Sequence, residues 1–256
     1  MSVSNDLSGT VVLVTGASSG IGEATARSAA AHGAHVALVA RRRDRLEALA
    51  TSIRGNYGSA LVVEADIAHE DQARAAIERT VAEFGRLDTL VNNAGIMLLG
   101  PIVDADVHAW TRMIDLNITA LMHCTHAALP HLAKAALEGP RRVADIVNVS
   151  SVAGRVARAG AGVYNATKFA IGAFSESLRQ EITKQHVRVS LVEPGAAATE
   201  LRLQNTEAVQ ATMTQRLGSI ETLHADDVAD AILYIVTRPR HVAINELLIR
   251  PTEQEA

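Results

Sequence analysis

Three residues in the stretch 151–168 have the types and the spacing needed to move a proton on an alcohol oxygen. Tyr164 and Lys168 are four positions apart, so in a helix they lie on one face, one turn from each other. A phenol is a proton donor, and a neighbouring ammonium stabilises its ionised form. Ser151 follows an apolar run that predicts a strand, which allows its hydroxyl to meet the phenol on one carbonyl oxygen. These residues predict acid–base chemistry at a carbonyl or alcohol group.

A glycine-rich segment near the N-terminus provides a second functional signal. The sequence TGASSGIG at 15–22 follows a β-branched run and precedes a helical pattern, with the spacing G-x-x-x-G-x-G. Glycines permit a tight turn and let the backbone approach a pyrophosphate at a helix N-terminus. In this position the segment predicts a dinucleotide site rather than a purely structural turn. The residues expected to form it are Gly16, Ser18, Ser19, Gly20, Ile21 and Gly22.

The end of the next predicted strand favours a phosphorylated cofactor. Residue 40, where an acidic residue would hold a ribose 2′-hydroxyl, is alanine, and arginines follow it directly. A guanidinium matches a 2′-phosphate in charge and in fork geometry, so we expect NADP(H), with Arg41 as the first contact and Arg42 as the second. The alternative is that these arginines only solvate the start of a helix. Asp66, with Ile67 beside it, is expected to accept from the adenine amino group, or else to be an ordinary loop residue.

These residues stand at the ends of segments that alternate between strand-like and helix-like patterns. Strands are expected at 10–14, 35–40, 60–65, 87–91, 143–149, 188–192 and 246–249, and helices at 23–32, 42–55, 69–84, 107–138, 163–185 and 226–236. The range 107–138 is either one long helix or two, and Pro130 is expected to bend or interrupt it. Such alternation calls for parallel strands with helices on both faces. We therefore expect one α/β domain over residues 1–256, a doubly wound Rossmann fold with a parallel seven-stranded sheet.

The long segment outside this alternation, 196–223, is expected to be a substrate lid. Residues 96–99, 152–154 and 196–198 would line a mainly apolar cleft below it. Arg155, Arg158 and Arg202 either bind a substrate carboxylate or are solvated. We therefore expect a medium-sized, partly apolar ketone or aldehyde as substrate, with a small hydroxy acid such as serine as the second possibility.

Composition excludes several classes of function. A net charge of −4 and a pI near 6.2 provide no basic surface for nucleic acid or an anionic membrane. No apolar run reaches the ~18 residues of a membrane span, and the N-terminus does not resemble a signal peptide, so we expect a cytoplasmic protein.

The single cysteine, Cys124, cannot form an internal disulfide and is expected to be buried and inert. His123 and His126 lack an acidic partner, so no metal site is expected.

Together these residues resemble the short-chain dehydrogenase/reductase family over essentially the whole chain. The matching pieces are TGASSGIG (15–22), Asp66, NNAG (92–95), Asn117, the set Ser151, Tyr164 and Lys168, and Pro194-Gly195 with Thr199. Strings such as WTRMIDLN and INELLIRPT are similar to the branch that contains clavulanic acid dehydrogenase and the NADP-dependent 3-hydroxy acid (serine-type) dehydrogenases. That branch implies an oxidoreductase, with secondary metabolism as one setting for it.

The resemblance implies a role for each matching residue. Tyr164 would be the acid or base, and Ser151 rather than Ser150 would hydrogen-bond the substrate oxygen. Lys168 would hold the nicotinamide ribose and lower the pKa of Tyr164, while Asn117 would support a water in a proton relay. Further cofactor contacts are implied for Asn93, Ala94, Gly95, Pro194, Gly195 and Thr199.

The resemblance also implies a homotetramer, or a homodimer, built on the helices at 107–134 and 163–185. The alternative to an enzyme is a non-catalytic dinucleotide sensor on the same fold. Retention of Tyr164 and Lys168 favours the enzyme.

Overall fold

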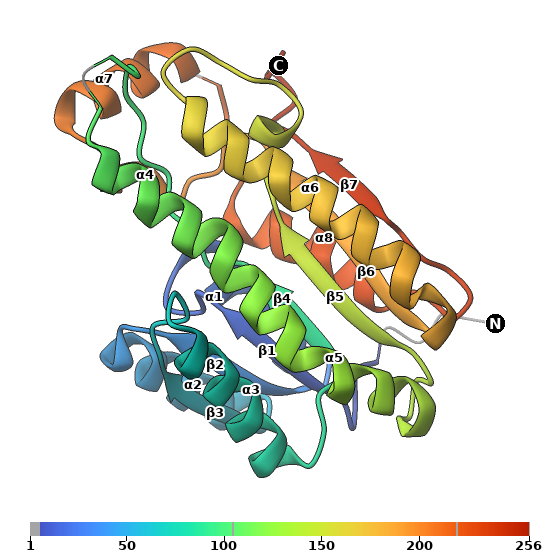
Figure 1. Ribbon diagram of the computed structural model, residues 1–256. Coiled ribbons are helices and arrows are strands. Elements are labelled where there is room, and N and C mark those ends of the chain that lie inside the picture. Colours follow the sequence, from blue (N-terminus) through green and yellow to red (C-terminus); the bar gives the residue numbers. More distant parts are fainter. Residues whose placement is uncertain (1–5, 104, 219, 256) are drawn as a thin grey trace.

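A parallel sheet of seven strands forms the centre of the molecule (Figure 1). The computed structural model describes residues 6–103, 105–218 and 220–255, so residue 219 of the predicted lid lies outside the described residues. Within them the strand order is β3-β2-β1-β4-β5-β6-β7, and every neighbouring pair is parallel. The strands are β1 (Val11–Thr15), β2 (His35–Ala40), β3 (Ala60–Glu64), β4 (Thr89–Asn92), β5 (Ala144–Val149), β6 (Val187–Pro194) and β7 (Glu246–Ile249). The prediction of a seven-stranded parallel sheet is confirmed.

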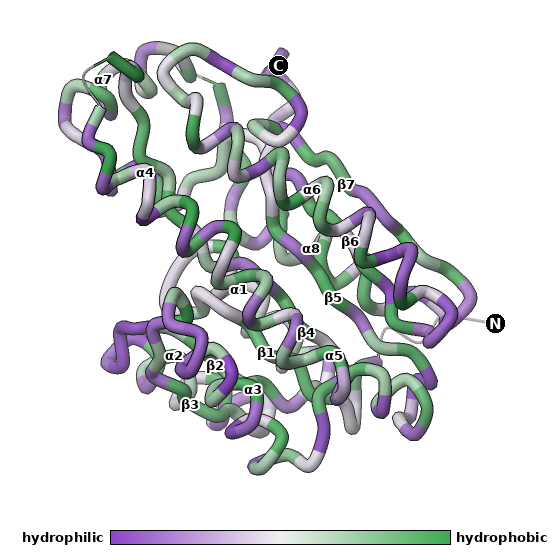
Figure 2. Tube along the Cα trace, viewed as in Figure 1, coloured by the Kyte–Doolittle hydropathy of each residue, from purple (hydrophilic) through white to green (hydrophobic). Residues whose placement is uncertain are grey.

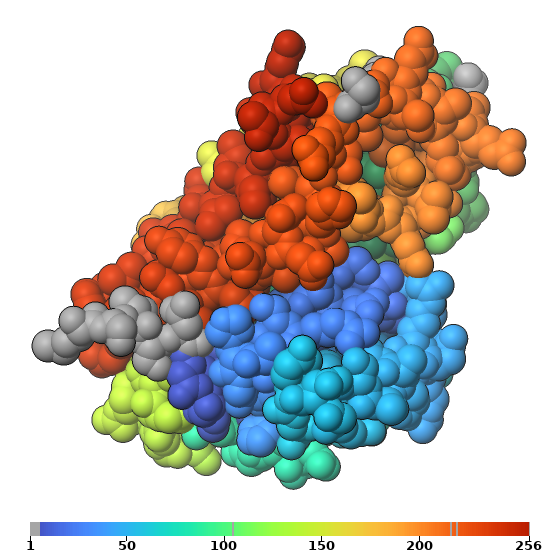
Figure 3. Space-filling model, turned by 180° about the vertical axis from the view of Figure 1, so that it is seen from behind, coloured from blue at the N-terminus to red at the C-terminus, as the bar shows by residue number. Residues whose placement is uncertain are grey.

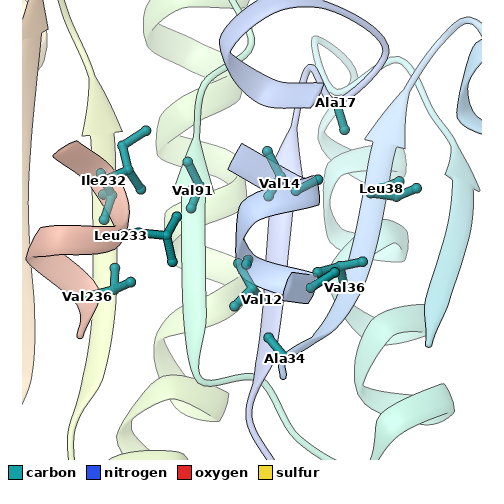
Figure 4. Close-up of a cluster of buried hydrophobic side chains, with 14 of the residues drawn as sticks. Val12, Val14, Ala17, Ala34, Val36, Leu38, Val91, Ile232, Leu233 and Val236 are labelled. Carbon is teal, nitrogen blue, oxygen red and sulfur yellow. The ribbon is translucent and has the colours of Figure 1, made fainter. Parts of the chain in front are cut away.

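Helices cover both faces of this sheet because its strands are apolar on both sides. One face carries α1 (Gly20–Ala31), α2 (Arg43–Asn56) and α8 (Ala225–Val236), and the other carries α3 (Glu70–Phe84), α5 (Ala120–Glu138) and α6 (Gly162–Ile182). Alternate residues of β1 serve the two layers: Val12 and Val14 belong to the first, Val11 and Leu13 to the second. Figure 4 shows the first layer, where Ile232 and Leu233 of α8 lie beside the sheet. In Figure 2 the strands are largely green, whereas the outer helices alternate between purple and green.

The predicted helix at 107–138 is divided, but not at the proline. It consists of α4 (Val107–Ile114), a π-helical segment η1 (Asp115–Thr119) and then α5, which continues through Pro130. Of the bend or interruption expected at Pro130, the interruption is therefore wrong. Pro130 and His126 both lie on the exposed side of α5, so water can satisfy the carbonyl that the proline leaves without a helical donor.

Two loops diverge at the carboxyl ends of β1 and β4, and they open a crevice there. The chain proceeds from β1 outward to β2 and β3, and from β4 outward to β7, so the direction of winding reverses between β1 and β4. Ligands of doubly wound sheets bind at such a point. The 196–223 segment lies at the same end and contains two short helices, η4 (Glu200–Gln204) and α7 (Glu207–Leu217). In Figure 1, α7 and α4 are at the same end of the molecule.

Two further short helices complete the described chain, η2 (Val152–Gly154) after β5 and η3 (Thr183–Gln185) after α6. Helix α1 begins at Gly20, three residues earlier than expected, because the last two glycines of the glycine-rich segment belong to its first turn. None of the helices in the described ranges is both long and apolar enough to cross a membrane.

Candidate active site

A deep cleft runs along the carboxyl end of the sheet, from the loop after β2 to the start of α6. Its volume is about 1390 Å³, which exceeds the roughly 300–1,000 Å³ of an ordinary small-ligand pocket. Such a volume accommodates a dinucleotide together with a small substrate. The predicted site residues that line it are Gly16, Ser18, Ser19, Gly20, Ile21, Arg41, Arg42, Asp66, Ile67, Asn93, Ala94, Gly95, Ser151, Tyr164, Lys168, Pro194, Gly195 and Thr199. The predicted residues Gly22 and Asn117 lie behind this lining.

The glycine turn is packed so tightly that side chains could not replace its glycines. Gly16 has a left-handed backbone with a φ of 69°, and a Cβ there would lie 2.9 Å from the Cα of Ala94. A Cβ on Gly22 would lie 2.4 Å from Nδ2 of Asn93, which itself donates to the carbonyl of Thr15 at 3.0 Å. The predicted cofactor residue Asn93 therefore supports the turn from behind, because its amide is occupied by the backbone.

Thr15 is a structural residue of the site that the sequence did not reveal. Its hydroxyl accepts hydrogen bonds from the backbone N–H groups of Asn93 at 3.0 Å and Ala94 at 3.1 Å. It thus fixes the loop after β4 to the glycine turn after β1. A threonine in a β-branched strand is ordinary, so the sequence carried no signal of this role.

The N-terminus of α1 opens into the cleft directly after the glycine turn. Ser19 precedes the helix and makes no side-chain hydrogen bond to its first turn. The positive end of the helix dipole and its first N–H groups suit a pyrophosphate. Thr199 closes the turn from the other side, since a Cβ on Gly20 would lie 3.3 Å from its methyl carbon. The residues present thus fit a dinucleotide cofactor.

Of the two arginines predicted to read a 2′-phosphate, Arg42 is fixed at the mouth of the glycine turn. Its guanidinium donates to the hydroxyls of Ser18 at 2.9 Å and Ser19 at 2.7 Å. The side chain of Arg41 is 67% exposed and lies 3.9 Å from a carboxylate oxygen of Asp66. The structure thus gives Arg42, which the sequence ranked second, the more defined position.

The predicted catalytic residues come together at the other end of the cleft. Ser151 follows β5 and precedes η2, where its hydroxyl accepts from the N–H of Ala153 at 3.1 Å. Tyr164 and Lys168 lie on one face of α6, with the ammonium nitrogen 5.8 Å from the centre of the phenol ring. A hydrogen bond joins Ser151 to the phenol. The neighbouring Ser150 donates to the carbonyl of Lys168 at 3.1 Å, so its hydroxyl holds α6 in place.

Burial controls the electrostatics of this set. It raises the pKa of Tyr164 to about 12, and the hydrogen bond from Ser151 lowers it by less. It lowers the pKa of Lys168 to about 8, and that ammonium donates to the carbonyl of Val149 at 3.0 Å. The resemblance implied that Lys168 lowers the pKa of Tyr164, but in the protein alone the net effect on this pKa is an increase, which burial causes. Tyr164 is only 6% exposed, so desolvation of its phenol is the largest effect on this pKa. Tyr164 is a protonated donor at neutral pH.

Asn117 lies in the π-helical segment η1 and joins two parts of the site. Its side chain accepts from the N–H of Ile96 at 2.8 Å and donates to the carbonyl of the same residue at 2.9 Å. It also donates to the hydroxyl of Thr167 in α6 at 3.2 Å. These bonds fix the loop after β4 relative to the helix that carries Tyr164.

Two further side chains hold the chain around η2 in place. Arg155, considered as a carboxylate anchor, donates to Glu193 at 2.8 Å and also pairs with Glu246, so that interpretation is wrong. Asn165 donates to the carbonyls of Ala153 at 2.7 Å and Val156, and so holds the loop after Ser151. Asn165 was missed; the available signal was a polar residue directly after Tyr164 in the sequence.

Cys124 is 1% exposed, as expected, and burial raises the pKa of its thiol to about 12, so it remains protonated. In the described residues no group of three or more histidine, cysteine or acidic side chains is arranged to hold a metal.

The family comparison agrees with this geometry. Residues 10–210 match the family described as "short chain dehydrogenase". This range includes the glycine turn and the Ser151, Tyr164 and Lys168 set. The chain belongs to this family. It is accordingly an NAD(P)-dependent oxidoreductase that acts on CH–OH groups.

Three similar proteins extend over nearly the whole chain. Sulfoacetaldehyde reductase 2 of Chromohalobacter salexigens is 39% identical over 247 residues, 95% of each chain. Serine 3-dehydrogenase of Agrobacterium fabrum is 37% identical over 250 residues, 97% of this chain and 96% of the other. A solved structure, the closed form of a serine dehydrogenase complexed with NADP+, has a TM-score of 0.84 and 33% identity and covers 96% of this chain and 97% of its own.

Proposed function

We propose that the protein is an NADP(H)-dependent dehydrogenase/reductase that interconverts a medium-sized, partly apolar ketone or aldehyde and its alcohol. The observation that carries this proposal is the arrangement of one cleft. Arg42 lies beside the glycine turn at one end, and a protonated Tyr164 joined to Ser151 lies at the other. The same cleft can thus hold a phosphorylated dinucleotide and a carbonyl oxygen.

In this proposal the protein orients the carbonyl and provides the proton. When bound, NADP(H) supplies or accepts the hydride. Ser151 and Tyr164 donate hydrogen bonds to the carbonyl oxygen, and Tyr164 transfers its proton as negative charge develops there. Donors placed where charge develops stabilise the transition state more than the ground state. Lys168 lies behind the phenol, where its positive charge favours the phenolate that remains.

The lining of the cleft favours a partly apolar substrate. Met97, Leu99, Val152, the alanines 196–198 and Met213 contribute mostly apolar surface to the lining of the cleft. A small 3-hydroxy acid is the second candidate, because Arg202 also lines the cleft and one relative is named for serine. Sulfoacetaldehyde, for which another relative is named, likewise carries an anionic group that an arginine would bind.

The 196–223 segment is proposed as the lid over this substrate. Its two ends are tied together, since Ala197 and Leu223 form an isolated parallel bridge. Asn205 at the end of η4 accepts from the N–H of Leu99 at 2.7 Å and donates to the carbonyl of Met97 at 2.8 Å. The lid therefore contacts the loop after β4 along one wall of the cleft.

The proposal is tested by following NADPH and NADH oxidation against a panel of ketones and aldehydes. We expect turnover with NADPH, and we expect Arg41→Ala and Arg42→Ala each to weaken NADPH about tenfold or more while changing NADH about twofold or less. Arg43→Ala is the matched control, because this 67% exposed side chain pairs with Glu47 and Glu64. Equal losses for both cofactors would contradict NADP(H) preference. Cofactor binding without turnover on any carbonyl would instead favour a dinucleotide sensor.

We also propose a homotetramer built on the helices at 107–134 and 163–185. Exposed apolar side chains on these helices support it: Val107 and Ile114 on α4 and Phe169 on α6. Light scattering coupled to size exclusion should give about four times the 27.1 kDa chain mass. A mass of one chain at micromolar concentration would overturn this part of the proposal.

A further inference from the structure

The two arginines at the start of α2 hold a carboxylate from a distant part of the chain. Glu200, the first residue of η4, accepts from Arg42 at 2.9 Å and from Arg45 at 2.6 Å, one guanidinium for each carboxylate oxygen. The remaining donors of Arg42 contact the hydroxyls of Ser18 and Ser19 on the glycine turn. An anion of the protein thus occupies the position where a 2′-phosphate is expected.

The charges of this cluster favour an exchange of anions. Hydrogen bonds from Arg42 and Arg45 lower the pKa of Glu200 to about 2, so its carboxylate is ionised at any working pH. The three side chains are between 42% and 44% exposed, and ion pairs in such surroundings are weak because water screens them. A phosphate monoester carries more charge and has three acceptor oxygens, so it is the stronger partner for the same guanidinium groups.

We propose that Glu200 is a specificity-determining residue that competes with the cofactor 2′-phosphate for Arg42 and Arg45. NADP(H) displaces this carboxylate, whereas NAD(H), which lacks the phosphate, leaves it in place. This inference rests on the proposed NADP(H) function, and it adds a residue of the lid to the discrimination between the two cofactors.

Displacement of Glu200 by the 2′-phosphate also changes contacts on the substrate side of the cleft. Glu200 begins η4, and Asn205 at the end of that helix is hydrogen-bonded to Met97 and Leu99. Figure 3 shows the orange residues of this segment lying against the blue residues of the first half of the chain, on the side where the cleft is hollowed. Release of Glu200 therefore frees one of the contacts that hold the lid segment against α2. The 2′-phosphate, bound to Arg42 and Arg45, thus changes how residues 200–204 are held although it makes no contact with them.

Two fragments of the cofactors test the competition without the nicotinamide. The probe is 2′,5′-ADP and its control is 5′-AMP, which differs by the 2′-phosphate. We expect Glu200→Gln to bind 2′,5′-ADP about three- to tenfold more tightly than the wild type, and to bind 5′-AMP within about twofold. Glu207→Gln is the matched control, since this exposed glutamate begins α7 in the same segment. We expect no change in either affinity for it. Calorimetry measures all of these affinities.

Hydrogen exchange tests the displacement itself. In the wild type, saturating 2′,5′-ADP should raise amide exchange in residues 200–204, whereas 5′-AMP should not. In Glu200→Gln the exchange there should already be raised and should not respond further. Unchanged or weaker binding of 2′,5′-ADP by Glu200→Gln, or added protection of residues 200–204 by 2′,5′-ADP, would overturn the inference. If the wild type binds 2′,5′-ADP no more tightly than 5′-AMP, then the NADP(H) preference itself fails, and the inference fails with it.

Discussion

Tyr164→Phe is expected to lower kcat for carbonyl reduction by about 10³-fold or more, while the affinity for NADPH changes about threefold or less. The substitution removes only the hydroxyl, and the ring still packs against Ile96 and Met113. Loss of a positioned proton donor costs roughly 10²–10⁴-fold, and loss of a hydrogen-bond donor to the developing oxyanion costs roughly 10²–10³-fold. One group performs both functions here, so the two losses overlap rather than multiply.

The measurement is steady-state NADPH oxidation with the best carbonyl of the panel, together with direct titration of NADPH binding. Tyr57→Phe is the control, because this phenol is 50% exposed and lies at the end of α2, away from the cleft. We expect it to retain full activity. If Tyr164→Phe kept a tenth or more of wild-type kcat, the proton would have to come from another group.

The candidate site was predictable where its residues lie close in sequence. Ser151, Tyr164 and Lys168 belong to one strand–helix unit, and helical spacing alone places the last two on one face. The glycine turn was predictable for the same reason, since a strand, a turn and a helix follow one another directly. In each case local backbone geometry fixes the relation between the side chains.

The long-range features were not predictable. Arg42 and Glu200 are 158 positions apart, and nothing in either neighbourhood indicates that their side chains meet. The raised pKa of Tyr164 has the same origin, because burial of the phenol depends on packing by Ile96 and Met113 from other segments. The sequence supplied the charge of Lys168, but the extent of desolvation exists only in the folded chain.

The fold, like the site, was predictable from the sequence in some parts and not in others. Strands with both faces covered are nearly continuous apolar runs, so the fully buried strands β1, β4, β5 and β6 were visible in the sequence. Helix α7 was not, because the Thr- and Gln-rich range 207–217 has no clear apolar stripe. The π-helical segment at Asp115–Thr119 also gave no signal.

Lys168→Met should make the protein more stable and much less active. Burial lowers the pKa of this ammonium from 10.5 to about 8, which corresponds to a destabilisation of roughly 3 kcal/mol at neutral pH. The substitution also removes the hydrogen bond from this charged ammonium to the carbonyl of Val149, worth about 1.5–3 kcal/mol. The net gain in the free energy of unfolding is therefore up to about 1.5 kcal/mol. We expect kcat to fall about 100-fold or more, because the charge that favours the phenolate is lost.

The pH dependence distinguishes this explanation from a simple packing gain. The pKa of Lys168 is lower in the folded state than in the unfolded state. In the wild type, stability therefore rises with pH between about 8 and 10.5, where the folded protein has released the proton and the unfolded chain still holds it. The advantage of Lys168→Met should be largest below pH 8 and shrink by pH 10. Urea unfolding at pH 7 and pH 10 measures it, with the exposed Lys184→Met as control. A variant that is less stable than the wild type at both pH values would show that the bond to Val149 outweighs the burial of the charge.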